Sequence, residues 1–458
     1  MKIVKLISDR LVFEPLSSKH LSTTYVNWMN DDIVNKFLES GGDYTLEKLK
    51  NFLIEQEKSK ILFWAIKIKK TKKHIGNIKI NPIDKKTNSG EYGIMIGDKI
   101  EWGKGFGFEA SKTVLNFCFD ELNLSEITLG VNNGNKSAIK LYRKLGFKEY
   151  DRIKFPDKYL NVKDNIVRMT KKNTINKIIL GTAQFGMNYG INNKNGQISK
   201  EEIVSILNYA FDNGIRFLDT AELYGNAIDM IGEFHKEHPE KKFKIFSKAV
   251  LRDNNPTKDL FENLKRLCID KYEGYMIHSY QDLIKDRKLY DKIHEAKKAG
   301  LIKKVGISLY SNQEIKDTIE NHNFDFIQLP FNLLDNSNKR EDIIRSAISS
   351  KIEIQIRSIF LQGLFFMSKS LIPIKLKPLE KYIDQLTKIC SDLSLEFDEL
   401  AIKYPIQKDY VDKVIFGIDN ITQLQRNVSI LRNNQSIPHV KIDAIDVLEN
   451  KLLNPTNW

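Results

Sequence analysis

Four side chains with complementary proton-transfer chemistry occur in one stretch of this sequence: Asp219, Tyr224, Lys248 and His278. A phenol has an ordinary pKa near ~10, which is too high for an efficient proton donor at neutral pH. An ammonium group beside it favours the phenolate and lowers that pKa, and a carboxylate keeps the ammonium charged and in place. A histidine nearby can donate a hydrogen bond to a carbonyl oxygen on which charge develops. The four groups together predict an acid catalyst for adding hydride to a carbonyl.

Each of these side chains, taken alone, has a structural explanation. An aspartate after a strand is usually a helix cap, and a histidine after an apolar pair is usually a core residue. Their positions favour a common function, because Asp219, Lys248 and His278 end three consecutive strand-like segments and Tyr224 follows the first of them. The successive gaps are 5, 24 and 30 residues.

The segments that carry them belong to a regular series of short β-rich stretches separated by helical ones. The eight stretches are KIILGTA, RFLDTAE, KFKIFSKAV, YEGYMIHS, IKKVGISL, FDFIQLPF, IEIQIRSIF and KVIFGI. Eight βα units in about 250 residues are typical of a (β/α)₈ TIM barrel, in which chemistry lies at the carboxyl ends of the strands. An open doubly wound sheet is the alternative, since alternation alone does not prove closure.

With these residues in view, the second part of the chain resembles the aldo-keto reductases. The opening GTAQFGMNYG is similar to the family's first strand and loop, and the resemblance extends over residues 176–435. It implies an NAD(P)H-dependent reductase whose coenzyme-binding residues come from three regions. The expected contacts are Ser308 and Gln328 to the nicotinamide carboxamide, Ser358 and Gly363 from RSIFLQG around the pyrophosphate, and Gly417, Gln423 and Asn427 from the last loop, IFGIDNITQLQRN.

The last loop departs from the family pattern in a way that concerns the choice of coenzyme. Asp419 and Gln423 stand where other members offer Ser or Lys, and Arg, to the 2′-phosphate of NADPH. A carboxylate there repels that phosphate. Arg426 and Lys413 are candidates to compensate, so NADPH is expected, with NADH as the alternative.

A second motif, WGKGFGFEA, occurs more than a hundred residues before the tetrad. Its glycines leave backbone N–H groups unobstructed just before a predicted helix over 109–122, which is a site for phosphate. One competing interpretation is a dinucleotide fingerprint, G-x-G-x-x-A, formed by Gly105, Gly107 and Ala110. The flanking segments do not build a parallel nucleotide-binding half, and the pattern alone is weak.

Together with VNNGNKSAIKLYRKLGF, this motif resembles the GCN5-type N-acetyltransferases, in the branch that includes ribosomal-protein and amino-sugar acetyltransferases. The resemblance covers about residues 5–170 and implies an N-terminal mixed-sheet acetyltransferase fold that uses acetyl-CoA. The implied roles are pyrophosphate binding by the amides of Lys104, Gly105, Phe106 and Gly107, a pantetheine contact by Asn135, and protonation of the departing thiolate by Tyr142.

The amine that accepts an acetyl group must lose a proton before it attacks, so a base is expected. Glu91 begins the strand-like segment EYGIMIG before the phosphate loop and is the first candidate. An exposed strand-end glutamate is the structural alternative. His74 is a weaker candidate for the same role.

Length and composition agree with two enzyme domains, in residues 1–172 and 173–458, with the polar segment MTKKNTIN as the linker. The chain has 458 residues, a formal net charge of +13 and three cysteines far apart in apolar segments. Its Lys and Arg are dispersed, so we expect diphosphate-bearing small ligands and no nucleic-acid or membrane partner. Reduced thiols and the lack of a signal-like start or long apolar run predict a cytoplasmic location. The oligomeric state is not indicated.

The two resemblances together suggest a bifunctional enzyme of amino-sugar or surface-glycan biosynthesis. Its acceptor is expected to be a nucleotide-linked amino sugar, because such pathways contain both amine acetylation and carbonyl reduction. Fold-level analogy does not fix a substrate, so two alternatives stay open. In one, a protein or peptide N-acetyltransferase is fused to an unrelated reductase. In the other, the barrel is a non-catalytic module for coenzyme sensing or scaffolding.

Overall fold

The computed structural model describes residues 3–38, 42–59, 61–85, 87–122, 124–150, 165–193, 196–249, 256–432 and 436–458. The chain forms two compact units, Met1–Asn173 and Thr174–Trp458. The first is built on a mixed β-sheet and the second on a closed barrel of parallel strands.

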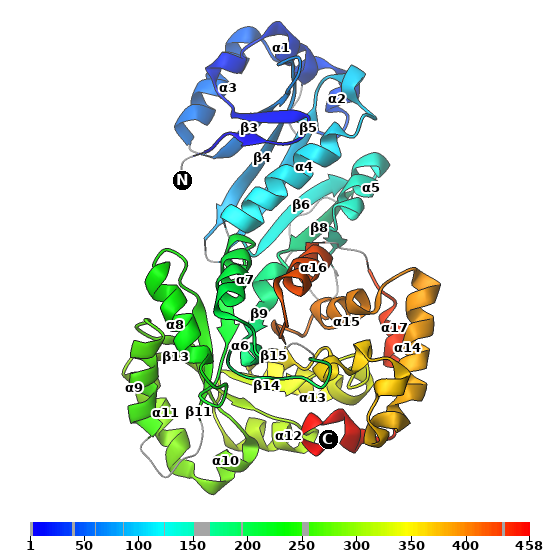
Figure 1. The fold of residues 1–458 in the computed structure, drawn as a ribbon. Helices are drawn as coiled ribbons and strands as arrows, with labels where there is room; N and C mark the ends of the chain where they lie inside the picture. Colours follow the sequence, from blue (N-terminus) through cyan, green and yellow to red (C-terminus); the bar gives the residue numbers. More distant parts are fainter. Residues whose placement is uncertain are drawn as a thin grey trace. The chain divides into compact units, whose positions relative to one another are not determined.

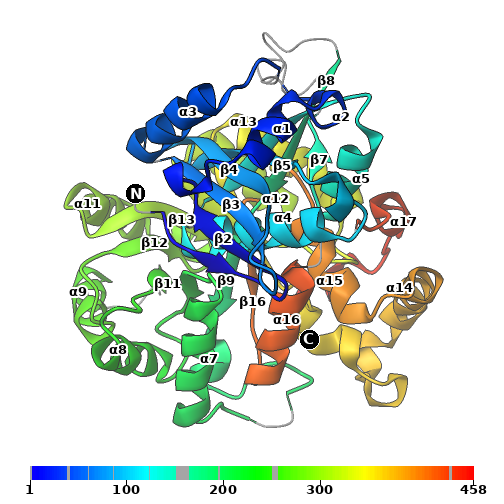
Figure 2. The same cartoon turned by 90° about the horizontal axis from the view of Figure 1, so that it is seen from above.

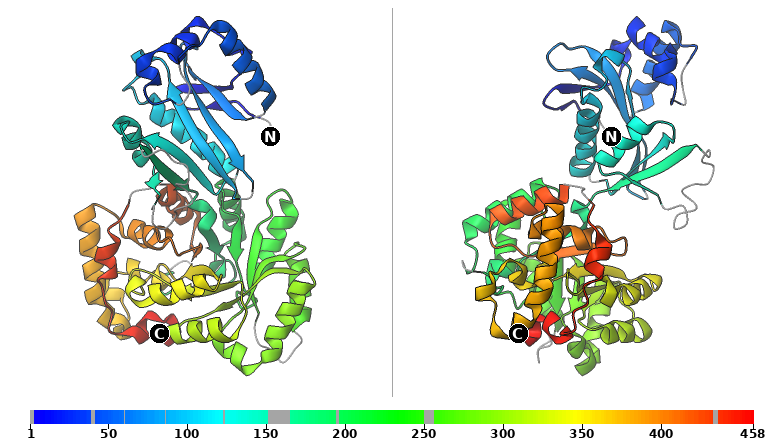
Figure 3. Two further views of the ribbon diagram at one scale, coloured as in Figure 1. Left: turned by 180° about the vertical axis from the view of Figure 1, so that it is seen from behind. Right: turned by 90° about the vertical axis from the view of Figure 1, so that its right-hand side faces the viewer.

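The first unit contains an eight-stranded sheet in the order β1-β2-β3-β4-β5-β6-β8-β7. Its strands are β1 (Leu6–Ile7), β2 (Leu11–Pro15), β3 (Leu62–Ile68), β4 (His74–Asp84), β5 (Ser89–Ile96), β6 (Glu126–Asn132), β7 (Lys148–Glu149) and β8 (Ile166–Lys172). Its helices, coloured from blue to teal in Figure 3, are α1 (Thr23–Asn30), α2 (Asp32–Asn35), α3 (Leu46–Ser59), α4 (Phe106–Asn116) and α5 (Lys136–Lys144).

The two faces of this sheet carry different apolar clusters, because side chains alternate along each strand. Tyr92, Ile94 and Ile96 of β5 pack with α4 and α5, whereas Met95 packs with the cluster of α1 and α3. Strands β5 and β6 run parallel but pair only from Ser89 to Glu91, so they diverge beyond that point into a V-shaped opening.

Two expectations for this unit were wrong. Met169–Lys172, predicted as part of a linker, belongs to β8, which pairs antiparallel with β6 along its whole length. Thr170 and its neighbours are polar because one side of this strand is only half-buried, not because it is a loop. The helix predicted over 109–122 begins earlier, at Phe106, and its last turn, Phe117–Glu121, is a π-helix.

The second unit contains a closed parallel barrel, which confirms the predicted (β/α)₈ architecture over an open sheet. The strand order is β10-β11-β12-β13-β14-β15-β16-β9, and Figures 1 and 2 show helices surrounding the strands. The strands are β9 (Ile178–Gly181), β10 (Phe217–Asp219), β11 (Lys244–Ala249), β12 (Tyr272–Ile277), β13 (Ile302–Ser308), β14 (Phe326–Pro330), β15 (Glu353–Arg357) and β16 (Lys413–Phe416).

Helices follow the barrel strands, with additional short ones in the loops. They are α6 (Ala183–Gly186), α7 (Lys200–Asp212), α8 (Ala227–Glu237), α9 (Pro256–Arg266), α10 (Tyr280–Lys285), α11 (Arg287–Lys298), α12 (Asn312–Asn321), α13 (Ser337–Ser349), α14 (Glu380–Leu393), α15 (Phe397–Ile406), α16 (Ile421–Arg432) and α17 (His439–Asp443).

The interior of the barrel contains two aromatic side chains that require glycine on the adjacent strand. Phe246 and Phe326 pack edge to face with ring centroids 5.5 Å apart. A Cβ atom on Gly274 would lie 2.3 Å from the Phe246 ring, and one on Gly306 would lie 2.3 Å from the Phe326 ring. The barrel is therefore a packed core that supports residues at its carboxyl end.

Within the described ranges, no helix combines the length and apolarity needed to cross a bilayer. The same ranges contain no cluster of three or more His, Cys, Asp or Glu side chains arranged to hold a metal ion. The three cysteines are free thiols; Cys118 and Cys390 are buried, whereas Cys268 is partly exposed.

Candidate active sites of the two units

The four tetrad residues meet at the carboxyl end of the barrel. Asp219 ends β10, Lys248 lies in β11, and Tyr224 and His278 follow β10 and β12. The Lys248 ammonium donates hydrogen bonds to the Asp219 carboxylate and, at 3.1 Å, to the Tyr224 hydroxyl. The second carboxylate oxygen of Asp219 accepts a hydrogen bond of 2.9 Å from Gln328 Nε2. Since Tyr224 accepts from the ammonium, its own proton is free to be donated elsewhere.

Burial decides the protonation states around this tyrosine. Asp219 and Lys248 are each only 3% exposed. Burial alone would lower the pKa of the Lys248 ammonium, but the Asp219 carboxylate outweighs that effect and the pKa is raised. Burial, followed by the charge of Lys248, lowers the pKa of His278 to about 4. Lysine is therefore charged and histidine neutral at neutral pH, which is the combination a proton donor with a neutral hydrogen-bonding partner needs.

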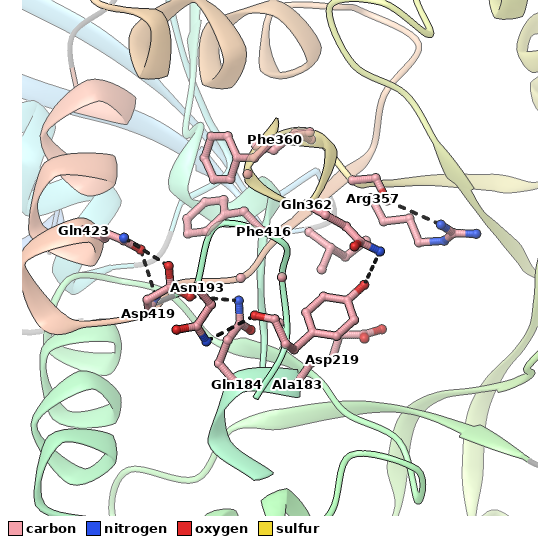
Figure 4. A pocket seen from close by; sticks show the side chains of 18 of the residues that line it. Ala183, Gln184, Asn193, Asp219, Arg357, Phe360, Gln362, Phe416, Asp419 and Gln423 are labelled. Atoms are coloured by element: carbon pink, nitrogen blue, oxygen red, sulfur yellow. Dashed lines mark hydrogen bonds between the residues drawn. The ribbon is translucent and has the colours of Figure 1, made fainter. Parts of the chain in front are cut away.

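A cavity of about 910 Å³ opens above the tetrad. All four tetrad residues line it, and so do all seven predicted coenzyme contacts, namely Ser308, Gln328, Ser358, Gly363, Gly417, Gln423 and Asn427. Figure 4 shows its side chains converging from several strand ends. The volume is in the upper range for small-molecule and cofactor sites.

Two glycines in the wall of this cavity are required by close packing against neighbouring side chains. Gly363 has a φ of +88°, and a Cβ there would lie 2.8 Å from the Cβ of Asn192. A Cβ on Gly417 would lie 2.7 Å from the side-chain amide of Gln184. The cavity has the size and the polar lining groups that a nicotinamide dinucleotide needs, and Ser308 and Gln328 line it together with the tetrad.

One part of the cavity is built from aromatic rings. Phe360 lies with its ring centroid 5.4 Å from that of Phe366 and 6.3 Å from that of Phe416. Phe397, at the start of α15, has its ring centroid 6.5 Å from that of Phe366. All four rings line the cavity. Rings of this kind suit the stacking of an adenine base. They come from the segment after β15, the start of α15 and the end of β16, and the sequence patterns did not single them out.

Both cations expected to offset Asp419 have partners elsewhere in the protein. Arg426 donates from Nε and Nη2 to the two carboxylate oxygens of Asp398, at 2.9 and 3.2 Å. Lys413 begins β16, so it lies at the amino end of the barrel, where it bonds Asn176 and covers the Phe217 ring at 4.0 Å. Asp419 itself is held by Gln423, whose Nε2 donates to Asp419 Oδ2 at 3.3 Å.

In the first unit, the predicted phosphate loop forms the start of α4. Gly105 is the N-terminal cap with a φ of +82°, and the amides of Phe106 and Gly107 belong to the first turn. Arg10 supports this loop, since its Nη1 donates to the Lys104 carbonyl at 3.1 Å and its guanidinium lies 4.5 Å above the Phe106 ring. The helix terminus and the glycines fit a diphosphate.

Helix α5 lies against this loop and carries the other two predicted residues. A Cβ on Gly107 would lie 3.7 Å from Leu141 of α5. Asn135 caps α5, because its Oδ1 accepts from the Ala138 amide at 3.1 Å. Tyr142 is buried with its ring centroid 5.8 Å from that of Tyr92, and burial raises its pKa to about 12. Its hydroxyl is therefore protonated at neutral pH.

Glu91 lies at the apex of the V between β5 and β6, as the last residue of β5 that pairs with β6. Its carboxylate accepts a hydrogen bond of 2.7 Å from Arg168 Nη1 and is 39% exposed. Tyr92, the residue after Glu91, points to the opposite face of the sheet, where its ring packs against that of Tyr142. The structure brings both residues to the apex, from opposite sides and without contact between them.

The weaker base candidate, His74, occupies a different environment. Its Nε2 lies 3.0 Å from both the Gly76 carbonyl and Asn77 Oδ1, and its ring packs on Tyr25 and Trp28. Burial lowers its pKa to about 4. These contacts give His74 a structural role.

Comparison with known proteins assigns a family to the chain. A sequence model of the aldo/keto reductase family matches residues 177–449, which is more than half of the chain. The chain belongs to the aldo/keto reductase family. A model of the acetyltransferase (GNAT) domain matches residues 10–148. This aldo/keto reductase therefore carries an acetyltransferase domain as well.

Individual relatives match one part of this aldo/keto reductase or the other. The uncharacterized oxidoreductase YqkF of Bacillus subtilis is 24% identical over 50% of this chain and 82% of its own length. The uncharacterized N-acetyltransferase p20 of Bacillus licheniformis is 35% identical over 19% of this chain. The chain spans about half the length of two of the curated relatives it matches, at 48% and 44%.

Among solved structures, an aldo-keto reductase from Pseudomonas aeruginosa shares 20% sequence identity with this chain. It aligns with a TM-score of 0.43 over 56% of this chain and 90% of that one.

Proposed function

We propose that the barrel reduces carbonyl compounds with a nicotinamide coenzyme. The observation that carries this proposal is the chain of hydrogen bonds from Asp219 through Lys248 to Tyr224, in a cavity that also contains His278. When bound, the coenzyme supplies a hydride to the carbonyl carbon. Tyr224 donates its proton to the carbonyl oxygen, and neutral His278 donates a hydrogen bond to the same oxygen. The product is an alcohol.

We propose NADH as the coenzyme, in place of the NADPH expected from the resemblance, because of the charges around the coenzyme end of the cavity. Three carboxylates line the part of the cavity built by α15, α16 and the loop after β16: Glu396, Asp398 and Asp419. Their nearest cation, Arg426, is neutralised by Asp398. A carboxylate accepts a hydrogen bond from a free ribose hydroxyl and repels a phosphate in the same place.

We also propose that the first unit transfers an acetyl group from acetyl-CoA to an amine. When bound, the coenzyme supplies the acetyl group. The amides of Gly105, Phe106 and Gly107 would hold its diphosphate. Tyr142, protonated and at the apex of the V, would donate a proton to the leaving sulfur. Glu91, on the other face, would accept the proton of the amine directly or through a water.

The acceptor that we propose is a nucleotide-linked amino sugar, in the synthesis of a surface glycan. The support is the combination of the two units, because such pathways acetylate amines and reduce carbonyls on related sugars. The positive net charge of +13 suits ligands with diphosphates. The cytoplasm, where acetyl-CoA and NADH are both made, is the proposed location.

The test is release of free CoA thiol from acetyl-CoA with three classes of acceptor: nucleotide-linked amino sugars, free amino sugars and N-terminal peptides. Release with the nucleotide-linked sugars alone supports the glycan proposal. Release with peptides alone contradicts it and favours a protein acetyltransferase. Oxidation of NADH with aldehydes, abolished in Tyr224→Phe, tests the reductase separately. Unchanged reduction in that variant would leave the barrel as a non-catalytic module.

A further inference from the structure

An arginine beside the tetrad is not used by the proposed reduction. Arg357 ends β15, and its side chain lines the same cavity as Tyr224 and His278. Its guanidinium lies 4.1 Å above the ring of Tyr310, from the loop after β13. Stacking on an aromatic face fixes the plane of a guanidinium and leaves its edge free for hydrogen bonds.

The edge of this guanidinium has weak partners. Its nitrogens lie 3.4 Å from Ser358 Oγ, 3.4 Å from the Leu309 carbonyl and 3.5 Å from Ser308 Oγ. Those distances are longer than the 2.7–3.2 Å of an ordinary hydrogen bond. Among the described residues, no carboxylate lies within ion-pair distance of Arg357. A half-buried guanidinium without an anion is an incomplete site.

The charge of Arg357 acts on two other residues that line the cavity. It contributes to the low pKa of His278, after burial and Lys248. It also opposes the rise that burial and Tyr224 cause in the pKa of Tyr189, another lining residue. In Figure 4, Arg357 lies on the side of the view opposite Asp419 and Gln423. The cavity thus has a cation next to the tetrad and carboxylates where the ribose end of the coenzyme is expected.

We propose that Arg357 binds an anionic group of the carbonyl substrate, a carboxylate or a phosphate. The guanidinium holds this group while Tyr224 and His278 bind the carbonyl oxygen. This inference rests on the proposed reduction and narrows its substrate class to carbonyl compounds that carry a negative charge. A guanidinium binds both kinds of anion through two parallel hydrogen bonds, so the experiment separates them.

The experiment compares matched substrates on the full chain with NADH. Succinic semialdehyde against butanal tests a carboxylate, and glyceraldehyde 3-phosphate against glyceraldehyde tests a phosphate. We expect kcat/KM to be at least about tenfold higher for the anionic member of one pair, mainly through KM. In Arg357→Gln, kcat/KM for the anionic substrate should exceed that for its neutral partner by no more than about threefold. Arg287→Gln, which removes an equal charge at the exposed start of α11, should keep the ratio.

Equal kcat/KM for both members of each pair would overturn the inference. So would an Arg357→Gln variant that keeps the ratio but binds NADH more weakly, because the guanidinium would then belong to the coenzyme site. If no aldehyde is reduced, the proposed reduction fails, and calorimetric titration of the NADH complex with succinate and with inorganic phosphate still decides the anion site. Binding of either anion that is lost in Arg357→Gln supports it, and no binding of either contradicts it.

Discussion

Lys248 joins two oxygens with different chemistry, and this single side chain explains why Asp219 and Tyr224 occur together. The ammonium is buried, which opposes its charge, but it bonds a buried carboxylate on one side and a phenol on the other. A buried pair of this kind contributes little net stability, and breaking it leaves an uncompensated charge. The position of the Asp219–Lys248 pair at a cavity is therefore better explained by catalysis than by folding.

His278 provides the first prediction, which concerns pH. Its pKa of about 4 lies below the ordinary value because burial and Lys248 both disfavour the imidazolium. The imidazole is neutral above that pH and becomes charged only below it. We therefore expect the pH profile of kcat/KM for carbonyl reduction to show no histidine limb between pH 5 and 8. A limb near pH 6.5 that disappears in His278→Asn would contradict this assignment.

Asp419 provides the second prediction, on the choice of coenzyme. The wild-type chain is expected to bind NADH at least about tenfold more tightly than NADPH, because Asp419 repels a 2′-phosphate and Arg426 is engaged by Asp398. Asp419→Ser should narrow that difference, and adding Asp398→Ala should narrow it further by releasing Arg426. The measurement is direct titration of each coenzyme, followed by protein fluorescence.

A matched control for these variants is Asp291→Asn on the exposed face of α11, which removes the same charge outside the cavity. Its ratio of NADH to NADPH affinity should equal that of the wild type. Tighter binding of NADPH than of NADH by the unmodified chain would show that the carboxylates of this region do not contact the ribose.

At the scale of elements, both sites depend on how neighbouring strands end. In the barrel, parallel strands deliver Asp219 and Lys248 to one rim, and the loops after them add Tyr224 and His278. In the sheet, β5 and β6 stop pairing at Glu91, so an opening forms between two strands whose helices α4 and α5 supply the phosphate loop and Tyr142. Regular strands position these residues more firmly than loops alone would.

The barrel interior gives the third prediction. Gly306→Ala places a methyl group 2.3 Å from the ring of Phe326, so the ring or the strand must move. Overpacking of this kind typically costs about 1–3 kcal/mol of unfolding free energy. We expect urea unfolding to begin at lower concentration, measured by hydrogen exchange of barrel peptides. Adding Phe326→Leu should restore part of the loss, whereas strictly additive losses would mean that the two residues are not coupled.

The elements themselves were largely predictable, because period-two strands alternating with helices leave a strong pattern in the sequence. The positions of the tetrad and of the cavity-lining loops were predictable for the same reason, because residues that follow the strands of a barrel lie together at its carboxyl end. Arg357 and Phe397 were not identified as site residues, because one ends β15 and the other begins α15, and their meeting in one cavity depends on tertiary packing that no local pattern records. The ion pair of Arg426 with Asp398 was not predictable from the sequence, because the two residues are 28 positions apart.

At the scale of the whole molecule, the chain combines two units that each contain a tyrosine expected to donate a proton, half-buried in the barrel and buried in the acetyltransferase unit. Tyr224 lies in the barrel and Tyr142 in the acetyltransferase unit. The two hydroxyl groups differ in environment, because Tyr224 bonds an ammonium, whereas Tyr142 packs among aromatic rings. Their loss should therefore affect different reactions, even though the residues belong to one chain.

The fourth prediction is reciprocal loss of the two activities. Tyr224→Phe should lower carbonyl reduction by about 10²- to 10⁴-fold and keep CoA release within twofold of the wild type, because only the proton donor of the barrel is removed. Tyr142→Phe should lower CoA release and keep the reduction. Retained NADH binding in Tyr224→Phe would show that the barrel is still folded. If either variant reduced both activities equally, the two sites would be coupled, and a common step involving both units would replace two separate reactions.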